Sequence, residues 1–259
     1  MSDGWGSPAP QPRRPGIQPR TTVWVIAGLA LVVVLVRTHH LSTFDILLFC
    51  ALIPSVILHE VSHGAVALAF GDDTAKRAGR LTLNPIPHID PFGTVILPVL
   101  LVLSGVGAFG YAKPVPVNVG RLRHPRNEGV VVSLVGPAVN VALALALVFG
   151  LVYAHMVPFS IKERVLMTGD ISQQPVWSLL IFLAGYINVI LAVFNLIPLP
   201  PLDGSAVVER LLPRHLLPGY YRIRPFTLFL PLIVILLFPQ ALNDVFNPAL
   251  NQWARVVGL

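Results

Sequence analysis

The chain has 259 residues, of which 54% are hydrophobic and only 12% are charged. Several of its apolar runs approach the roughly 20 residues that a helix needs to cross a bilayer, so this composition is typical of a multi-span membrane protein. The formal net charge of +6 resembles that of a nucleic-acid-binding protein. Arginine-rich cytoplasmic loops account for it better, and no nucleic-acid partner is expected. The single cysteine, Cys50, excludes an intramolecular disulfide.

Residues 1–21 are rich in Pro, Gly and Arg and have no apolar periodicity, which predicts a disordered tail. Residues 22–259 are expected to form a single membrane-embedded domain. Its predicted spans, in chain order, are Thr22–Val36, Phe44–Phe70, Gly129–Ala154, Pro175–Ile197 and a last one near Pro225–Leu242. Together with an ambiguous apolar stretch, they predict an all-α polytopic membrane protein with about five to six transmembrane helices.

The ambiguous stretch, Phe92–Gly110, is expected to enter the membrane and return on the same side. With this course and a cytoplasmic N-terminus, 14 of the 18 lysines and arginines are cytoplasmic, whereas a full crossing would leave only nine there. Pro98 and Gly105 suit a broken hairpin, and an ordinary proline-kinked helix is the alternative. The flanking segments, Leu81–Ile86 and Val115–Val119, are β-compatible and bounded by prolines. We expect them to form a small strand edge that captures an extended substrate.

The span Phe44–Phe70 contains the motif HEVSH at residues 59–63. On a helix His59 and His63 lie one turn apart on the same face, the spacing with which two imidazoles hold one zinc ion. Glu60 follows the first histidine and can reach a water on that metal. A chance match is the alternative, but an unpaired carboxylate near the middle of a bilayer costs about 2.5 kcal/mol or more. The motif in this setting predicts a zinc site.

Asp203 is the best candidate for a third zinc ligand. If Phe92–Gly110 does not cross, the span that ends near Asp203 runs parallel to the histidine helix, so Asp203 and His63 lie at the same cytoplasmic end. The prolines of residues 198–201 interrupt that helix where it would meet the site. A plain Asp-Gly turn is the alternative. With three protein ligands the zinc would activate a water, and Glu60 would take the proton and pass it to the leaving amine.

Two asparagines in apolar helices are candidate substrate-binding residues. Asn195 can donate to the substrate carbonyl or the oxyanion, or it can form an interhelical hydrogen bond, which contributes under ~2 kcal/mol. Asn140 has the same two interpretations, and the nearby Gly136 and Pro137 favour close helix packing. His88 is interpreted as a turn histidine, with a spare metal ligand or a residue that supports a ligand as alternatives.

Five motifs, in order along residues 50–210, are HEVSH, NPIPHIDPFG, FGYAKPVPVN, GPAVN and NLIPLPPLDG. This set resembles the site-2 protease family of intramembrane zinc metalloproteases, and most of all its compact bacterial branch without PDZ or CBS domains. The resemblance implies that His59, His63 and Asp203 bind one Zn²⁺. It also implies that Glu60 is the catalytic acid/base and that Asn195 contacts the substrate.

The resemblance further implies that the substrates are single transmembrane helices that are cut within the bilayer. We expect a multi-pass protein of the cell membrane, and the distribution of lysine and arginine places its N-terminus and active-site end in the cytoplasm. Its partners would be the lipid bilayer and transmembrane-helix proteins. The sequence specifies neither the identity of the substrate, nor the cleavage position, nor the oligomeric state.

Two other functions fit parts of the pattern. A membrane metal transporter also places histidine and aspartate in helices. However, transport needs polar groups along a whole path, whereas these groups cluster at one depth beside a catalytic-type glutamate. A non-catalytic homologue that acts as a scaffold is disfavoured, because His59, Glu60, His63 and Asp203 are all intact.

Overall fold

The computed structural model describes the chain over the ranges 43–90, 93, 112–153, 176–213, 215–223 and 239–256. Within these ranges the regular structure is helical and contains no strand. Three long helices dominate: α2 (Thr43–Ala69), α5 (Pro125–Tyr153) and α7 (Val176–Leu196). Their apolar stretches of 24, 23 and 18 residues make them the three described helices that are long and apolar enough to cross a membrane.

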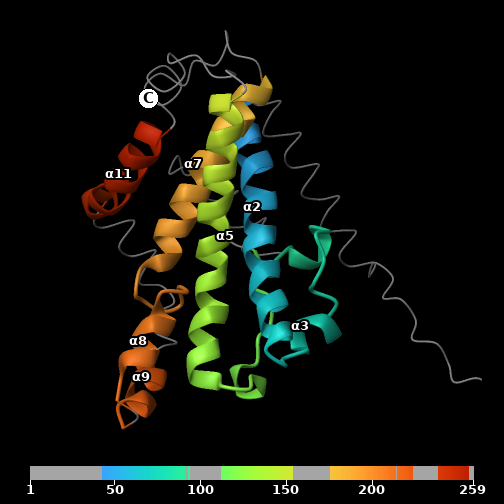
Figure 1. The fold of residues 1–259 in the computed structure, drawn as a ribbon, viewed down its shortest axis with the longest axis vertical. Coiled ribbons are helices and arrows are strands. Elements are labelled where there is room, and N and C mark those ends of the chain that lie inside the picture. Colours follow the sequence, from blue (N-terminus) through green and yellow to red (C-terminus); the bar gives the residue numbers. More distant parts are fainter. Residues whose placement is uncertain are drawn as a thin grey trace, which may run out of the picture. The chain divides into compact units, whose positions relative to one another are not determined.

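The three long helices lie side by side (Figure 1). Leu47 near the start of α2 packs in one apolar cluster with Leu179 near the start of α7 and Ala144 in the second half of α5. Toward the other end of the bundle, His63 of α2 hydrogen-bonds with Val132 in the first half of α5. Helices α2 and α7 therefore run parallel and α5 runs antiparallel to both, so the C-terminal ends of α2 and α7 lie together.

The main apolar cluster lies in the half of the bundle that contains the start of α7. Leu179 and Phe182 of this helix are almost fully buried there. Helix α11 (Pro239–Val256) packs against this part of α7, with the ring of Trp253 centred 5.4 Å from that of Phe182. A Cβ on Gly185 would lie 2.7 Å from the Trp253 ring, so this glycine allows the two helices to approach.

The chain leaves α2 and enters α5 at the same end of the bundle. Gly71 follows the end of α2 with a φ of +105°, a conformation that glycine adopts without strain. The backbone N–H of Arg123 donates to the carbonyl of Phe70 at 3.2 Å, so the start and the end of this connection meet. The described residues of the connection include three short helical turns: α3 (Thr74–Arg77), η1 (Ile86–His88) and η3 (Val119–Arg121).

Asp72 fixes the connection to the end of α2. Its buried carboxylate accepts hydrogen bonds from the backbone N–H of Thr74 at 3.0 Å and from that of Asn118 at 2.6 Å. Burial alone would raise the pKa of the Asp72 carboxyl, but these bonds and one from the Thr74 hydroxyl lower the pKa overall. The charged form of Asp72 therefore stabilises this folded connection.

Two short helices follow α7: α8 (Ser205–Leu211) and α9 (Leu217–Ile223). The guanidinium of Arg126, at the start of α5, donates to the backbone carbonyls of Arg210 at 2.8 Å and Leu212 at 2.6 Å. These bonds satisfy carbonyl groups at the C-terminal end of α8 and attach α8 to α5.

The predicted strand edge does not form in the part of the chain that the structure describes. Leu81–Ile86 passes through bends into η1, and Val115–Val119 is irregular up to the start of η3. Pro85 and Pro116 have no backbone N–H and a fixed φ, which opposes a hydrogen-bonded ladder. The β part of the predicted fold is thus not found here.

Several predicted segments lie outside the described residues. They are the tail 1–21, the span Thr22–Val36, all but Gly93 of Phe92–Gly110, and Pro225–Phe238 of the last predicted span. Residues 239–242, expected to end that span, instead begin α11. The count of five to six spans and the re-entrant course of Phe92–Gly110 stay predictions.

Candidate metal centre

Two histidines of α2 and an aspartate beyond α7 converge inside the bundle. The Nε2 atoms of His59 and His63 lie 3.1 Å apart. Asp203 Oδ2 lies 3.1 Å from His59 Nε2 and 3.4 Å from His63 Nε2. Both histidines are buried, and Asp203 is half-buried. Among the described residues these three form the group whose ligand atoms, all within 4.8 Å of one another, can hold one metal ion.

Hydrogen bonds decide which ring nitrogens face the centre of this group. His59 Nδ1 lies 2.5 Å from the side-chain oxygen of Asn140, and His63 Nδ1 lies 2.6 Å from the carbonyl of Val132. Both oxygens only accept, so each Nδ1 carries the proton and each neutral Nε2 presents a lone pair. Two lone pairs and a carboxylate oxygen at such distances repel one another unless a cation lies between them. Asp203 Oδ2 is also buried without a hydrogen-bond partner, so this donor set fits a metal ion.

Gly136 of α5 leaves room beside the two histidines. A Cβ built at this position would lie 2.4 Å from His63 Nε2 and 2.6 Å from His59 Cε1. Both distances are far below van der Waals contact, so any side chain here would displace the imidazoles or fill the space next to their coordinating nitrogens. The glycine therefore serves the ligand group as well as the helix packing that the sequence predicted.

A tight turn brings Asp203 back to the end of α7. The N–H of Gly204 donates to the carbonyl of Asn195 at 2.6 Å, and a Cβ on Gly204 would lie 2.3 Å from the carbonyl oxygen of Leu196. Only glycine fits against the helix end at this position. The prolines of residues 198–201 stop α7 just before the turn, so the chain folds back and Asp203 faces the histidines.

Glu60, between the two histidines in sequence, contacts the connection that leads to α5. Its Oε2 accepts a hydrogen bond of 2.8 Å from the backbone N–H of Val115. The side chain is half-buried, and this bond fixes the direction of its carboxylate. The irregular segment before η3 therefore lies beside the HEVSH motif and supplies a backbone donor to it.

Arg80 holds this irregular segment in place. Its buried side chain donates to the carbonyl of Pro87 and to those of Lys113 at 2.7 Å and Pro114 at 3.1 Å. The last of these carbonyls directly precedes the N–H that binds Glu60. Burial lowers the pKa of the Arg80 guanidinium, and the negative charge of Glu60 opposes that shift.

The two predicted substrate-binding asparagines have different surroundings. Asn140 is fully buried, with its oxygen at His59 and its Nδ2 donating to Asn188 Oδ1 at 2.7 Å. Asn195 is half-buried and donates through Nδ2 to the Leu191 carbonyl of its own helix at 3.0 Å. A contact of either asparagine with a substrate stays a prediction.

His88 lies apart from the ligand group. It is buried in η1, where its Nε2 is 3.0 Å from the carbonyl of Thr82. Its own carbonyl accepts from the N–H of Lys113 at 2.9 Å, so it joins two parts of the connection. This position agrees with a histidine that stabilises a turn.

Three buried polar residues near the site were not singled out from the sequence: Ser55, Asn188 and Arg80. A signal existed for the first two, because Ser55 lies one helical turn before His59 and Asn188 lies two turns before Asn195. Polar residues at such intervals in apolar helices indicate a shared buried face. Nothing marks Arg80 as buried, because it belongs to a loop that carries other basic residues.

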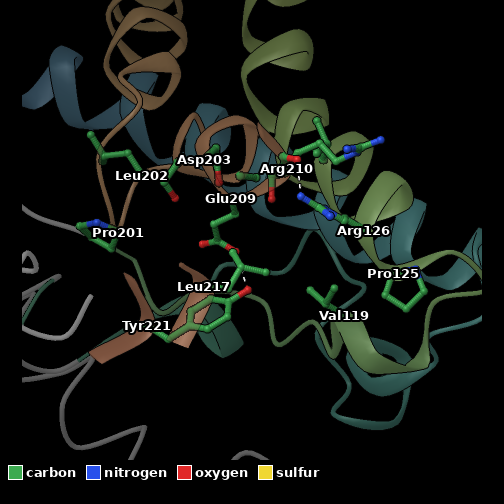
Figure 2. Close-up of a pocket in the computed structure, with 15 residues that line it drawn as sticks. Val119, Pro125, Arg126, Pro201, Leu202, Asp203, Glu209, Arg210, Leu217 and Tyr221 are labelled. Carbon is green, nitrogen blue, oxygen red and sulfur yellow. Dashed lines mark hydrogen bonds between the residues drawn. The ribbon is translucent and has the colours of Figure 1, made fainter. Parts of the chain in front are cut away.

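A pocket of about 310 Å³ opens beside Asp203, between α5, α8 and α9 (Figure 2). Val130 and Leu217 contribute apolar surface to its lining, and Glu209 and Tyr221 contribute polar groups that bond to each other at 3.2 Å. Of the three residues of the ligand group, Asp203 contributes to this lining, whereas the two histidines do not.

The structure thus places a His-Glu-x-x-His pair and an aspartate around one point in a bundle of three helices that are long and apolar enough to cross a membrane. The chain belongs to Peptidase family M50, whose model matches residues 47–238. The resemblance to the site-2 protease family is thereby confirmed.

Two relatives illustrate this membership. The chain is 44% identical over 166 residues to "Putative zinc metalloprotease YwhC" of Bacillus subtilis (strain 168), an alignment that covers 64% of this chain and 69% of that protein. It is 34% identical over 210 residues to "Putative zinc metalloprotease Rip2" of Mycolicibacterium smegmatis, an alignment that covers 80% of this chain and 70% of that protein. No solved structure matches the chain.

Proposed function

We propose that this protein is a zinc-dependent intramembrane endopeptidase, which hydrolyses a peptide bond within or near the transmembrane helix of a membrane-protein substrate. The observation that carries the proposal is the convergence of His59, His63 and Asp203 within a bundle of three span-length helices. Membership of a peptidase family and the zinc in the names of its relatives support it. One Zn²⁺ per chain would be held by these three residues, and when bound it lowers the pKa of a ligand water to about 7 and polarises the scissile carbonyl.

Glu60 acts as the catalytic acid/base in this proposal. Its place directly after His59 brings its carboxylate next to the ligand group, and the Val115 N–H holds its Oε2 at 2.8 Å. Oε1 then takes the proton of the attacking water and delivers it to the leaving amine. Asn195 is the asparagine that we propose contacts the substrate, because both polar ends of Asn140 are engaged inside the bundle.

We propose that the protein is a multi-pass protein of the cell membrane, with its N-terminus and the ligand end in the cytoplasm. The excess of lysine and arginine in the segments assigned to that side supports this orientation. The bond between Arg123 and Phe70 supports a connection that returns to the side from which it starts, and hence a re-entrant course for Phe92–Gly110. A substrate would approach through the pocket beside Asp203.

The test uses the full-length protein in lipid vesicles and a fluorescent single-span peptide with a helix-destabilising Gly-Pro pair. Glu60→Gln is expected to retain zinc and to lose cleavage by roughly 10²- to 10⁴-fold, because the proton acceptor is lost while the ligands remain. Chelation should abolish cleavage by the wild type, and added zinc should restore it. Asp244→Asn, which removes an exposed carboxylate on α11, is the control and should cleave at the wild-type rate.

Undiminished cleavage by Glu60→Gln would exclude the proposed role of this glutamate, and a zinc-loaded wild type that does not cleave the peptide would contradict the proposed reaction. A wild type that binds zinc and moves it across the vesicle membrane, unaffected by Glu60→Gln, would instead identify a transporter.

A further inference from the structure

A chain of buried polar side chains leads away from the ligand group through all three long helices. Asn140 Nδ2 of α5 donates to Asn188 Oδ1 of α7 at 2.7 Å, and Asn188 Nδ2 donates to Ser55 Oγ of α2 at 2.8 Å. The Ser55 hydroxyl donates to the carbonyl of Ala51 at 2.8 Å. The side chains of Asn140, Asn188 and Ser55 are all buried. At the end of this series nearest the ligand group, Asn140 Oδ1 accepts a hydrogen bond from His59 Nδ1.

Two helix carbonyls, those of Ala184 and Ala51, set the direction of these bonds. Asn188 Nδ2 also donates to the carbonyl of Ala184 at 2.8 Å, so both hydrogens of this amide are used. Turning the amide around would place its oxygen against the Ala184 carbonyl, and two acceptors would repel each other. Asn188 must therefore present its oxygen to Asn140, and Asn140 must present its own oxygen to His59.

This direction decides the protonation of His59. An amide oxygen cannot donate, so His59 Nδ1 must carry the hydrogen and Nε2 keeps the lone pair that a metal needs. If Asn140 were free to turn, its NH₂ group could donate to Nδ1. The hydrogen would then move to Nε2, where it blocks coordination.

We infer that Asn188 is a positioning residue for the metal centre. It touches neither the metal nor the substrate, and it keeps Asn140 oriented so that His59 stays in the metal-binding tautomer, with Ser55 supporting its other end. The inference rests on the proposed zinc site. Interhelical hydrogen bonds in membrane bundles contribute little to stability on average, whereas groups that orient a ligating histidine change metal affinity by about 10- to 100-fold.

The experiment measures the zinc affinity of the full-length protein in detergent by competition with a chelator of known affinity. Asn188→Leu is expected to weaken zinc binding by about 10- to 100-fold. Asn251→Leu is the control, because it makes the same substitution at an exposed asparagine of α11, outside the ligand group, and its zinc affinity should equal that of the wild type.

A rescue separates positioning from packing. In the Asn188→Leu background, Asn140→Asp places a group that can only accept opposite His59 Nδ1, whatever residue occupies position 188. Zinc affinity should return to within a few-fold of the wild type. A weakened Asn188→Leu that Asn140→Asp fails to rescue would show a packing defect and overturn the inference, as would an Asn188→Leu with unchanged affinity.

A milder variant covers the case in which Asn188→Leu does not fold. Ser55→Ala leaves Asn188 its bond to Ala184, so a smaller loss of zinc affinity, a few-fold, is expected together with unchanged thermal unfolding of the metal-free protein. An affinity equal to that of the wild type would contradict the inference. Failure of the wild type itself to bind zinc would instead reject the proposed zinc site, so the two failures are distinguishable.

Discussion

His59 shows how one proton separates a metal ligand from an ordinary buried histidine. The i, i+4 spacing of His59 and His63 places both rings on one face of α2, but it does not determine which nitrogen is free. Asn140 and Val132 decide that, because each offers an oxygen that only accepts. The negative charge of Asp203 then completes a group of atoms that is stable only around a cation.

The close packing of Gly136 against His59 and His63 predicts the effect of one added methyl group on zinc affinity. Gly136→Ala is expected to reduce zinc affinity by about tenfold or more, because the new Cβ would overlap the His63 Nε2 position at 2.4 Å. Zinc content after dialysis, measured by atomic absorption, checks this. Gly219→Ala is the control, since a Cβ at that helical position meets nothing within 4 Å. Equal zinc content in both variants would show that the histidines can move aside without cost.

In the described residues of the connection between α2 and α5, two buried charges fix the backbone between the short helical turns. Asp72 accepts from backbone N–H groups, and Arg80 donates to backbone carbonyls. Charged side chains thus satisfy polar groups that a strand ladder would otherwise pair, which explains how an irregular segment stays ordered beside α2. Its Val115 N–H reaches Glu60 as a result.

We expect Arg80→Gln to slow peptide cleavage more than tenfold while zinc content stays unchanged. Two or three carbonyls would lose their donor, at about 1–3 kcal/mol for each group left buried and unpaired, and the segment that orients Glu60 would loosen. Parallel measurements of kcat and bound zinc separate this effect from loss of the metal.

Arg77→Gln is the control for this substitution. It removes a neighbouring arginine whose exposed ion pair with Asp73 contributes little. Loss of zinc together with activity in Arg80→Gln would place the role of Arg80 at the ligands instead of at Glu60.

At the scale of the whole molecule, the parallel course of α2 and α7 brings the two histidines and Asp203 to one depth. An antiparallel pair would place Asp203 at the opposite end of the bundle from His63. Helix α5, which runs antiparallel to both, contributes Asn140, Val132 and Gly136 to the same region. Each of the three long helices that the structure describes therefore supplies or supports a candidate ligand.

This topology predicts a labelling pattern. In a Cys50→Ser background, single cysteines at Lys76 in α3 and at Leu211 in α8 should react with a membrane-impermeant maleimide from the same face of the membrane. A cysteine at Val176, at the other end of α7, should react from the opposite face. All three positions are exposed. Comparison of right-side-out and inverted vesicles measures this, and labelling of Lys76→Cys and Leu211→Cys from opposite faces would contradict the parallel arrangement.

Much of the fold and of the site could be predicted from the sequence because the signals are local. Apolar length identified α2, α5 and α7, and the four-residue spacing of His59 and His63 indicated a metal. The approach of Asp203 was also predicted, because the charge count favoured a re-entrant Phe92–Gly110 and hence a parallel course of α2 and α7. The prediction of a strand edge was wrong, because a composition that suits strands does not determine which groups the backbone N–H and C=O will pair with.

The sequence by itself determined which residues can bind a metal and which helices carry them, because these properties depend on neighbours within a few turns. Only the tertiary structure decided which ring nitrogen of His59 carries the proton, because that depends on Asn140, 81 residues away. It also decided the orientation of the Asn140 amide, which depends on Asn188, a further 48 residues along the chain. It also decided that Arg80 is buried among carbonyls rather than exposed in a basic loop. Hydrogen-bond direction is a property of the assembled bundle, because α7 places the Asn188 oxygen beside the Asn140 amide, and Asn188 is oriented by Ala184 of its own helix and Ser55 of α2.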